Sequence, residues 1–154
     1  EIPANGVSKG SIVSIEDAVS SISHILDQTE RIIGDKIDSL YVGVSGLHIS
    51  SMSSKGTVAV SRPKGEIMED DIERVIGAAQ TVATPPNCEI LHVIPKTFMV
   101  DNQAGVKDPI GMSGVRLEVD TQIIQGQSSY INNITKAVAR AGVDIDDLVL
   151  GILA

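Results

Sequence analysis

Two long strand-like runs, separated by a loop rich in glycine, proline and charge, occupy residues 88–126. Successive side chains of a strand point to opposite faces, so alternation of apolar and polar residues predicts a strand with one buried and one solvated face. The second run alternates in this way, with Val115, Leu117, Val119, Thr121 and Ile123 on one face and Arg116, Glu118, Asp120 and Gln122 on the other. In the first run, 89–100, Pro95 lacks a backbone donor and predicts an edge strand or a bulge. The two runs predict an antiparallel hairpin.

The connection between the runs, residues 101–114, is longer than most hairpin loops. Loops of this size are typically functional or disordered, so we expect any binding to involve it. It can also be interpreted as a folded loop in which Lys107 pairs with Asp108 and Pro109 fixes a turn, and the two interpretations are compatible. The exposed edge of 89–100 offers a second mode, in which an extended peptide or another copy adds a strand.

Apolar residues recur every three or four positions in three further segments, which predicts helices. Ser14 is the expected N-cap and Gly34 the expected C-cap of the first helix. The predicted helices are 15–33, 69–83 and 128–141; the remaining predicted strands are 38–49, 57–60 after a turn at 54–56, and 147–153, which is uniformly apolar and should be buried on both faces. This mixture predicts an α/β (α+β) fold whose hairpin packs on helices.

Composition argues against several classes of function. The net charge is −8 and no cluster of Lys and Arg is present, which argues against binding to nucleic acid or to anionic lipid. Cys88 is the only cysteine, so an internal disulfide is excluded and a reducing cytoplasm fits the sequence. The glycines at 105 and 111 are not followed by the Gly-Lys-Ser/Thr of a phosphate loop, and the histidines lack ligand spacing.

The string HVIPKTFMVDNQAGVKDPIGMSGVRLEVDTQII, with SKGSIVSIEDAV and YVGVSGLHI, resembles the FtsA family of actin-like bacterial cell-division proteins over essentially the whole chain. The resemblance implies that residues 51–144 form an inserted strand-helix-strand-strand subdomain, called 1C, and that 1–50 and 145–154 are parts of the neighbouring 1A sheet. Asn102 departs from the usual glycine, and Met68 replaces a threonine that often caps the helix. PilM, a pilus-assembly relative, shares the general fold, but residues 108–114 look like FtsA.

The resemblance implies a non-enzymatic interaction module with no catalytic, cofactor or metal residues. Its partners would be other FtsA protomers and late division proteins such as FtsN, at the inner, cytoplasmic face of the membrane at the septum. The family binds ATP, FtsZ and the membrane through motifs that this sequence lacks, so we expect those contacts only from other regions of a full-length protein. The candidate protein-binding residues are Lys107, Asp108, Met112, Arg116, Asp70 and Asp71.

Two other classes of function remain open from the sequence. One is an actin-like ATP-binding protein whose nucleotide site lies outside these residues. The other is a small-molecule sensing domain of ferredoxin-like layout, which would need an apolar pocket under the hairpin.

Overall fold

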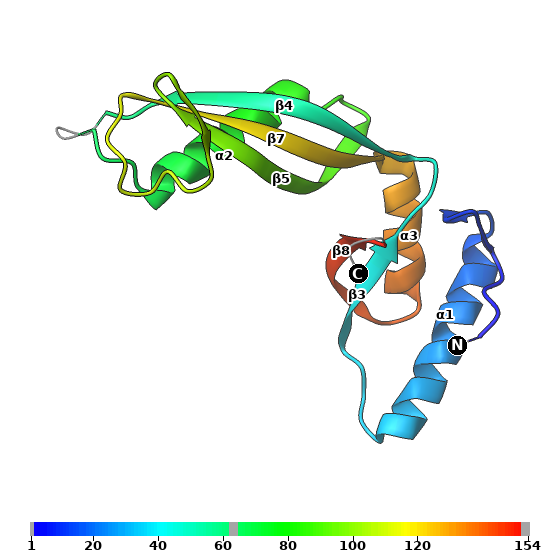
Figure 1. The fold of residues 1–154 in the computed structure, drawn as a ribbon. Coiled ribbons are helices and arrows are strands. Elements are labelled where there is room, and N and C mark those ends of the chain that lie inside the picture. The colour runs from blue at the N-terminus through cyan, green and yellow to red at the C-terminus, as the bar shows by residue number, and fades with distance from the viewer. Residues whose placement is uncertain (1, 62–64, 152–154) are drawn as a thin grey trace. The chain divides into compact units, whose positions relative to one another are not determined.

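The computed structural model describes residues 2–61 and 65–151, which form three helices and eight strands in two compact units (Figure 1). The helical unit contains the described residues up to Ile49 and from Gly126 onward, and the sheet unit contains Ser50–Gln125. The mixed α/β composition predicted from the sequence is confirmed.

A four-stranded sheet with the strand order β4-β7-β5-β6 forms most of the sheet unit. Its strands are β4 (Ile49–Ala59), β5 (Cys88–Val100), β6 (Gln103–Val106) and β7 (Arg116–Gln127). The Thr121 hydroxyl donates to the Ser54 carbonyl (3.0 Å) and the Val60 N–H to the Val115 carbonyl (2.9 Å), so β4 and β7 run antiparallel. β5 lies next to β7, as the predicted hairpin requires, and pairs antiparallel with β6.

Helix α2 (Glu69–Ala83) packs on one face of this sheet. Val75 and Ala79 of the helix are fully buried in one cluster with Leu117 and Val119 of β7. The predicted alternation of β7 is therefore confirmed, with Leu117, Val119, Thr121 and Ile123 buried and with polar side chains between them. Val115 precedes the strand and is exposed.

The turn predicted at 54–56 is wrong, because β4 continues without interruption from Ile49 to Ala59. A Cβ atom at Gly56 would lie 2.0 Å from the Val75 carbonyl oxygen and 2.9 Å from the Ala79 nitrogen. The Ser54 hydroxyl donates to the Ala79 carbonyl at 2.8 Å. Gly56 thus permits close approach of α2 to the sheet, which is another recognised use of glycine in a strand.

In the helical unit, α1 (Ile15–Ile33) packs beside α3 (Ser128–Arg140). Both predicted caps of α1 are confirmed: the Ser14 hydroxyl accepts from the Asp17 N–H at 3.4 Å, and Gly34, at φ +80°, donates to the Glu30 carbonyl. A short hairpin of β1 (Val7–Ser8) and β2 (Ser11–Ile12) precedes α1.

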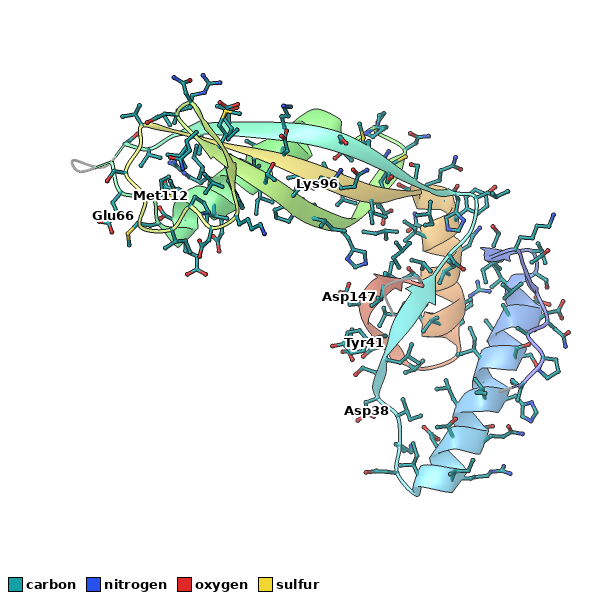
Figure 2. The ribbon with its side chains drawn as sticks, in the orientation of Figure 1. Asp38, Tyr41, Glu66, Lys96, Met112 and Asp147 are labelled. Atoms are coloured by element: carbon teal, nitrogen blue, oxygen red, sulfur yellow. The ribbon has the colours of Figure 1, made fainter. Side chains whose placement is uncertain are left out.

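A parallel pair of strands, β3 (Ser39–Val44) and β8 (Asp144–Leu150), completes the helical unit. The predicted burial of the last strand on both faces is wrong for the described residues: of β8 only Leu150 is buried, and residues 152 and 153 lie outside the described part. The reason is that β3 and β8 pair only with each other among the described strands. Tyr41 and its register partner Asp147 are both exposed (Figure 2).

The inserted segment inferred from the family resemblance, 51–144, extends further than the sheet unit, which ends at Gln125. The difference is mainly helix α3. The structure groups α3 with the helical unit because it packs against α1 and β8.

His48 leads to a prediction about stability and pH. His48 is only 6% exposed, and burial lowers its pKa below the ordinary value of 6.5. At pH values between the lowered pKa and 6.5, His48 binds more protons in the unfolded chain than in the folded chain. The free energy of unfolding is therefore unaffected by His48 above pH 6.5 and decreases as the pH falls below 6.5. Urea unfolding at about pH 7.5 and about pH 5.5 measures this loss. A His48→Phe variant keeps an aromatic ring and should show a smaller loss; an equal loss would show that His48 does not contribute.

Candidate protein-binding site

The connection between β5 and β7 is more ordered than its length suggests. Its first part forms strand β6, which folds back on β5 through a tight turn at residues 101–102. Asp101 adopts the left-handed conformation of this turn (φ +53°), so Asn102 does not need the glycine that is usual in the family. The Asp101 carboxylate accepts from the N–H groups of Val115 (3.1 Å) and Arg116 (3.0 Å). The turn is thereby tied to the start of β7.

The second part of the connection is bonded to the segment that precedes α2. The Ile67 N–H donates to the Met112 carbonyl (2.9 Å), the Gly111 N–H to the Ile67 carbonyl (2.9 Å) and the Gly114 N–H to the Gly65 carbonyl (2.8 Å). Ile67 and Pro109 are among the most deeply buried side chains of the described residues. We call residues 65–70 and 107–116 the loop–helix surface. The structure therefore joins the predicted loop to the predicted acidic helix start.

Four of the six predicted binding residues lie in the loop or at its end. Lys107, Asp108 and Arg116 are exposed, whereas Met112 is half-buried and packs against the core of the sheet unit. Asp108 accepts from the Ile110 N–H at 3.1 Å, which is the bond that stabilises the turn, in place of the predicted pairing with Lys107. Arg116 forms an ion pair with Glu118 (2.7 Å) on the solvated face of β7.

The two predicted aspartates at the start of α2 differ. Asp70 is exposed, but Asp71 is only 2% exposed and cannot present its carboxylate to a partner. Asp71 accepts from the Met68 N–H (3.1 Å) and from the Arg74 guanidinium (2.9 Å). This carboxylate compensates for Met68, which has no side-chain capping bond. Asp71 therefore has a structural role.

Three exposed apolar residues of this surface were not among the binding residues predicted from the sequence. Met68 is 48% exposed, Ile110 53% and Val115 69%. Two of them had a sequence signal, because Met68 replaces a polar cap and Ile110 lies between a proline and a glycine. Apolar side chains surrounded by charged ones are typical of protein interaction surfaces. Glu66 and Met112 mark this end of the sheet unit in Figure 2.

Strand β5 has a partly open edge. Its neighbours are β7 on one side and β6 on the other, but β6 pairs only with the end of β5, at Phe98 and Val100. Among the described strands, residues 93–97 have no strand partner on the β6 side. This part of β5 is an edge, as Pro95 predicts, and its backbone groups can accept another strand.

A small-molecule sensing domain would need an apolar pocket under the hairpin. The pocket beside the hairpin, between Lys55, Phe98, Gly105 and Asp120, has a volume of about 40 Å³ and a partly charged lining. It has room for little more than a water molecule and is not the apolar pocket that a sensing domain requires. Within residues 2–61 and 65–151, no group of three His, Cys, Asp or Glu side chains is placed to hold a metal ion. No helix in this part of the chain is long and apolar enough to cross a membrane.

Residues 46–125 match the family described as "SHS2 domain inserted in FTSA". The chain is 41% identical to the cell division protein FtsA of Pseudomonas aeruginosa over 152 residues, which is 99% of the chain and 36% of that protein. It is 45% identical to FtsA of Borreliella burgdorferi over 98% of the chain and 37% of that protein. For FtsA of Bacillus subtilis the identity is 42%, over 99% of the chain and 35% of that protein. The chain thus spans about a third of the length of these relatives.

Among solved structures, a PilM-PilN type IV pilus biogenesis complex has a chain of similar fold. The TM-score is 0.55 at 11% sequence identity, and the match covers 97% of the present chain and 38% of that chain. At this identity the similarity concerns the fold alone.

Proposed function

The chain belongs to the FtsA family of cell-division proteins, and we propose from this premise that it is a protein-interaction module of the division machinery. The proposed partners are late division proteins such as FtsN and other FtsA protomers, at the cytoplasmic face of the membrane at the septum. We propose no enzymatic activity and no cofactor for these residues; ATP would be bound only in a full-length protein. The observation that carries the proposal is the anchored, partly apolar loop–helix surface.

Anchoring supports binding because association is weakened by the entropy lost when flexible segments become ordered. Backbone hydrogen bonds already fix Ile67 to Gly111 and Met112 in the free chain. Little further ordering is needed when a partner covers Ile110. A rigid surface with few apolar contacts fits a docking site of modest affinity.

The charges of the surface indicate the kind of segment that would fit. Glu66, Glu69 and Asp70 are exposed acidic residues at the start of α2. Lys107 and Arg116 are exposed cations on the loop side. A segment with a basic residue towards α2 and an acidic residue towards Lys107 and Arg116 would complement both sets of charges, and an apolar side chain on it would cover Ile110.

For contacts between FtsA protomers, the open edge of β5 is the better candidate. Strand addition uses main-chain hydrogen bonds, which residues 93–97 can provide on the side away from β7. The two modes use different parts of the sheet unit and can be tested separately.

An amide chemical-shift titration with the cytoplasmic tail of the cognate FtsN tests the docking site. We expect the shift changes to cluster in residues 65–70 and 107–116. Ile110→Ser should weaken binding about fivefold, because truncating an apolar contact costs about 1 kcal/mol. Ile32→Ser is the matched control, since Ile32 is also exposed but lies on α1 of the helical unit.

Absence of shift changes in a well-dispersed spectrum would refute the tail-docking proposal. Sedimentation of the same sample over a range of concentrations would then test the protomer contact. If the chain also remained monomeric, the assignment of an interaction role to these residues would have to be abandoned.

A further inference from the structure

The imidazole ring of His48 is tightly packed in the helical unit. It stacks on the ring of Tyr130 in α3, with centroids 4.9 Å apart and planes 6° from parallel. Its Nδ1 edge lies against Gly46, where an added Cβ would be 3.0 Å from Nδ1 and 3.1 Å from Cε1. Gly46 also has φ +134°, which residues with a side chain rarely adopt. Glycine at position 46 therefore makes room for the ring.

This packing suits the neutral ring and disfavours the protonated one. Both nitrogens are less than 1 Å² exposed, and neither has a hydrogen-bond partner among the described residues. A protonated imidazole carries two N–H donors, and both would be unpaired here. Burial of an unpaired charge is costly, which is why the pKa of His48 is lowered. A proton on His48 therefore favours any arrangement in which the ring reaches water.

The groups around the ring do not stabilise a positive charge. Among the described residues that surround His48 between the β1-β2 hairpin and α3, the ionisable ones are Lys9 and Tyr130. Lys9 is itself a cation, and neither residue is an anion near neutral pH. The face of the Tyr130 ring attracts a cation, but this attraction is much weaker than the penalty for burying an unpaired charge. The charged ring is therefore more stable in water than in the stack.

The surroundings of the stack allow the ring to leave it locally. A pocket of about 290 Å³ lies between the β1-β2 hairpin and the start of α3, and His48 and Tyr130 both line it. Rotation into this space would expose both ring nitrogens to water. The Ile49 N–H donates to the Gly46 carbonyl and the Gln127 N–H to the His48 carbonyl, both at 3.2 Å. This distance is at the upper end of the range for such bonds, so the turn is weakly held.

We propose that His48 and Tyr130 form a pH-sensitive switch. With a neutral ring, the stack holds the turn of residues 46–49 against α3. Protonation drives the ring out of the stack and into the pocket, and the two backbone bonds open while the rest of the helical unit stays folded. The first response to acid is then local and precedes global unfolding. Both residues belong to the helical unit, so the switch is independent of the proposed docking surface.

Hydrogen exchange of the 154-residue chain tests the switch. The protection factors of the Ile49 and Gln127 amides should fall about tenfold between about pH 7.5 and about pH 5.5, because the open turn binds a proton at the ordinary pKa of 6.5 and the closed turn does not. A low concentration of urea should not change them, because local opening exposes little surface. Urea should lower the protection of Val138, a buried residue inside α3 that exchanges through larger unfolding.

NOEs between the rings of His48 and Tyr130 provide a second measurement on the unsubstituted chain, and they should disappear as His48 titrates. His48→Phe keeps an aromatic stack and binds no proton, so the fall in protection should be absent. His24→Phe, at an exposed histidine of α1, should retain it. NOEs that persist in the protonated protein would overturn the proposal, because the stack would then tolerate the charge. Unchanged protection between the two pH values, the same fall in His48→Phe, or a parallel response of all three amides to urea would overturn it as well.

Discussion

Replacing Gly56 by alanine should lower the free energy of unfolding by about 3 kcal/mol, the upper part of the range for an overpacked core. The added methyl group would lie 2.0 Å from the Val75 carbonyl oxygen. That oxygen belongs to the backbone of α2, so the clash cannot be relieved by a change of rotamer. The helix would have to move away from the sheet, which would disturb the Ser54 to Ala79 hydrogen bond of 2.8 Å. Urea unfolding of the two proteins measures the loss.

Gly77→Ala is the matched control for this experiment. Gly77 lies in α2, and a Cβ there would meet nothing within 4 Å. The same substitution should therefore stabilise the chain by up to about 1 kcal/mol, because alanine has the higher helix propensity. If Gly56→Ala were as neutral as an exposed substitution, α2 would not approach β4 as closely as the structure has it.

Gly56 also shows where sequence reasoning fails in this chain. Ser54-Lys55-Gly56 has the local composition of a turn, but the packing of α2 determines its conformation. The caps of α1 were predictable because Ser14 and Gly34 act on their own helix ends. The alternation of β7 was predictable because one face of the strand meets the core.

The candidate binding site shows the same contrast between features set by local sequence and features set by packing of distant segments. The loop stands out in the sequence by its length and composition, and the backbone bonds of Ile67 connect it to the segment before α2. The burial of Asp71 could not be predicted, since its first-turn position suits an exposed acid equally well.

Replacing Ile67 by alanine should lower the free energy of unfolding by about 3 kcal/mol, since the side chain is fully buried (0% exposed) and its loss leaves a cavity. Ile67 also bonds through its backbone to Gly111 and Met112. The smaller alanine side chain would pack less tightly at this position, which should weaken those backbone hydrogen bonds. We therefore expect the Gly111 and Gly114 amides to exchange with solvent about tenfold faster relative to global unfolding, an additional local effect of about 1.4 kcal/mol.

Ile123→Ala separates the two effects. Ile123 is also 0% exposed and lies in the same unit. It belongs to β7, is distant in sequence from residues 65–67, and has no recorded backbone hydrogen bond to them. Its loss should cost a similar free energy of unfolding, about 3 kcal/mol, without selective exchange at Gly111 and Gly114. Equal exchange in the two variants would mean that the loop opens only with the whole unit, and the loop–helix surface would then be as rigid as the core. Selective exchange would instead show that Ile67 holds the loop–helix surface in its native conformation, which the proposed docking requires.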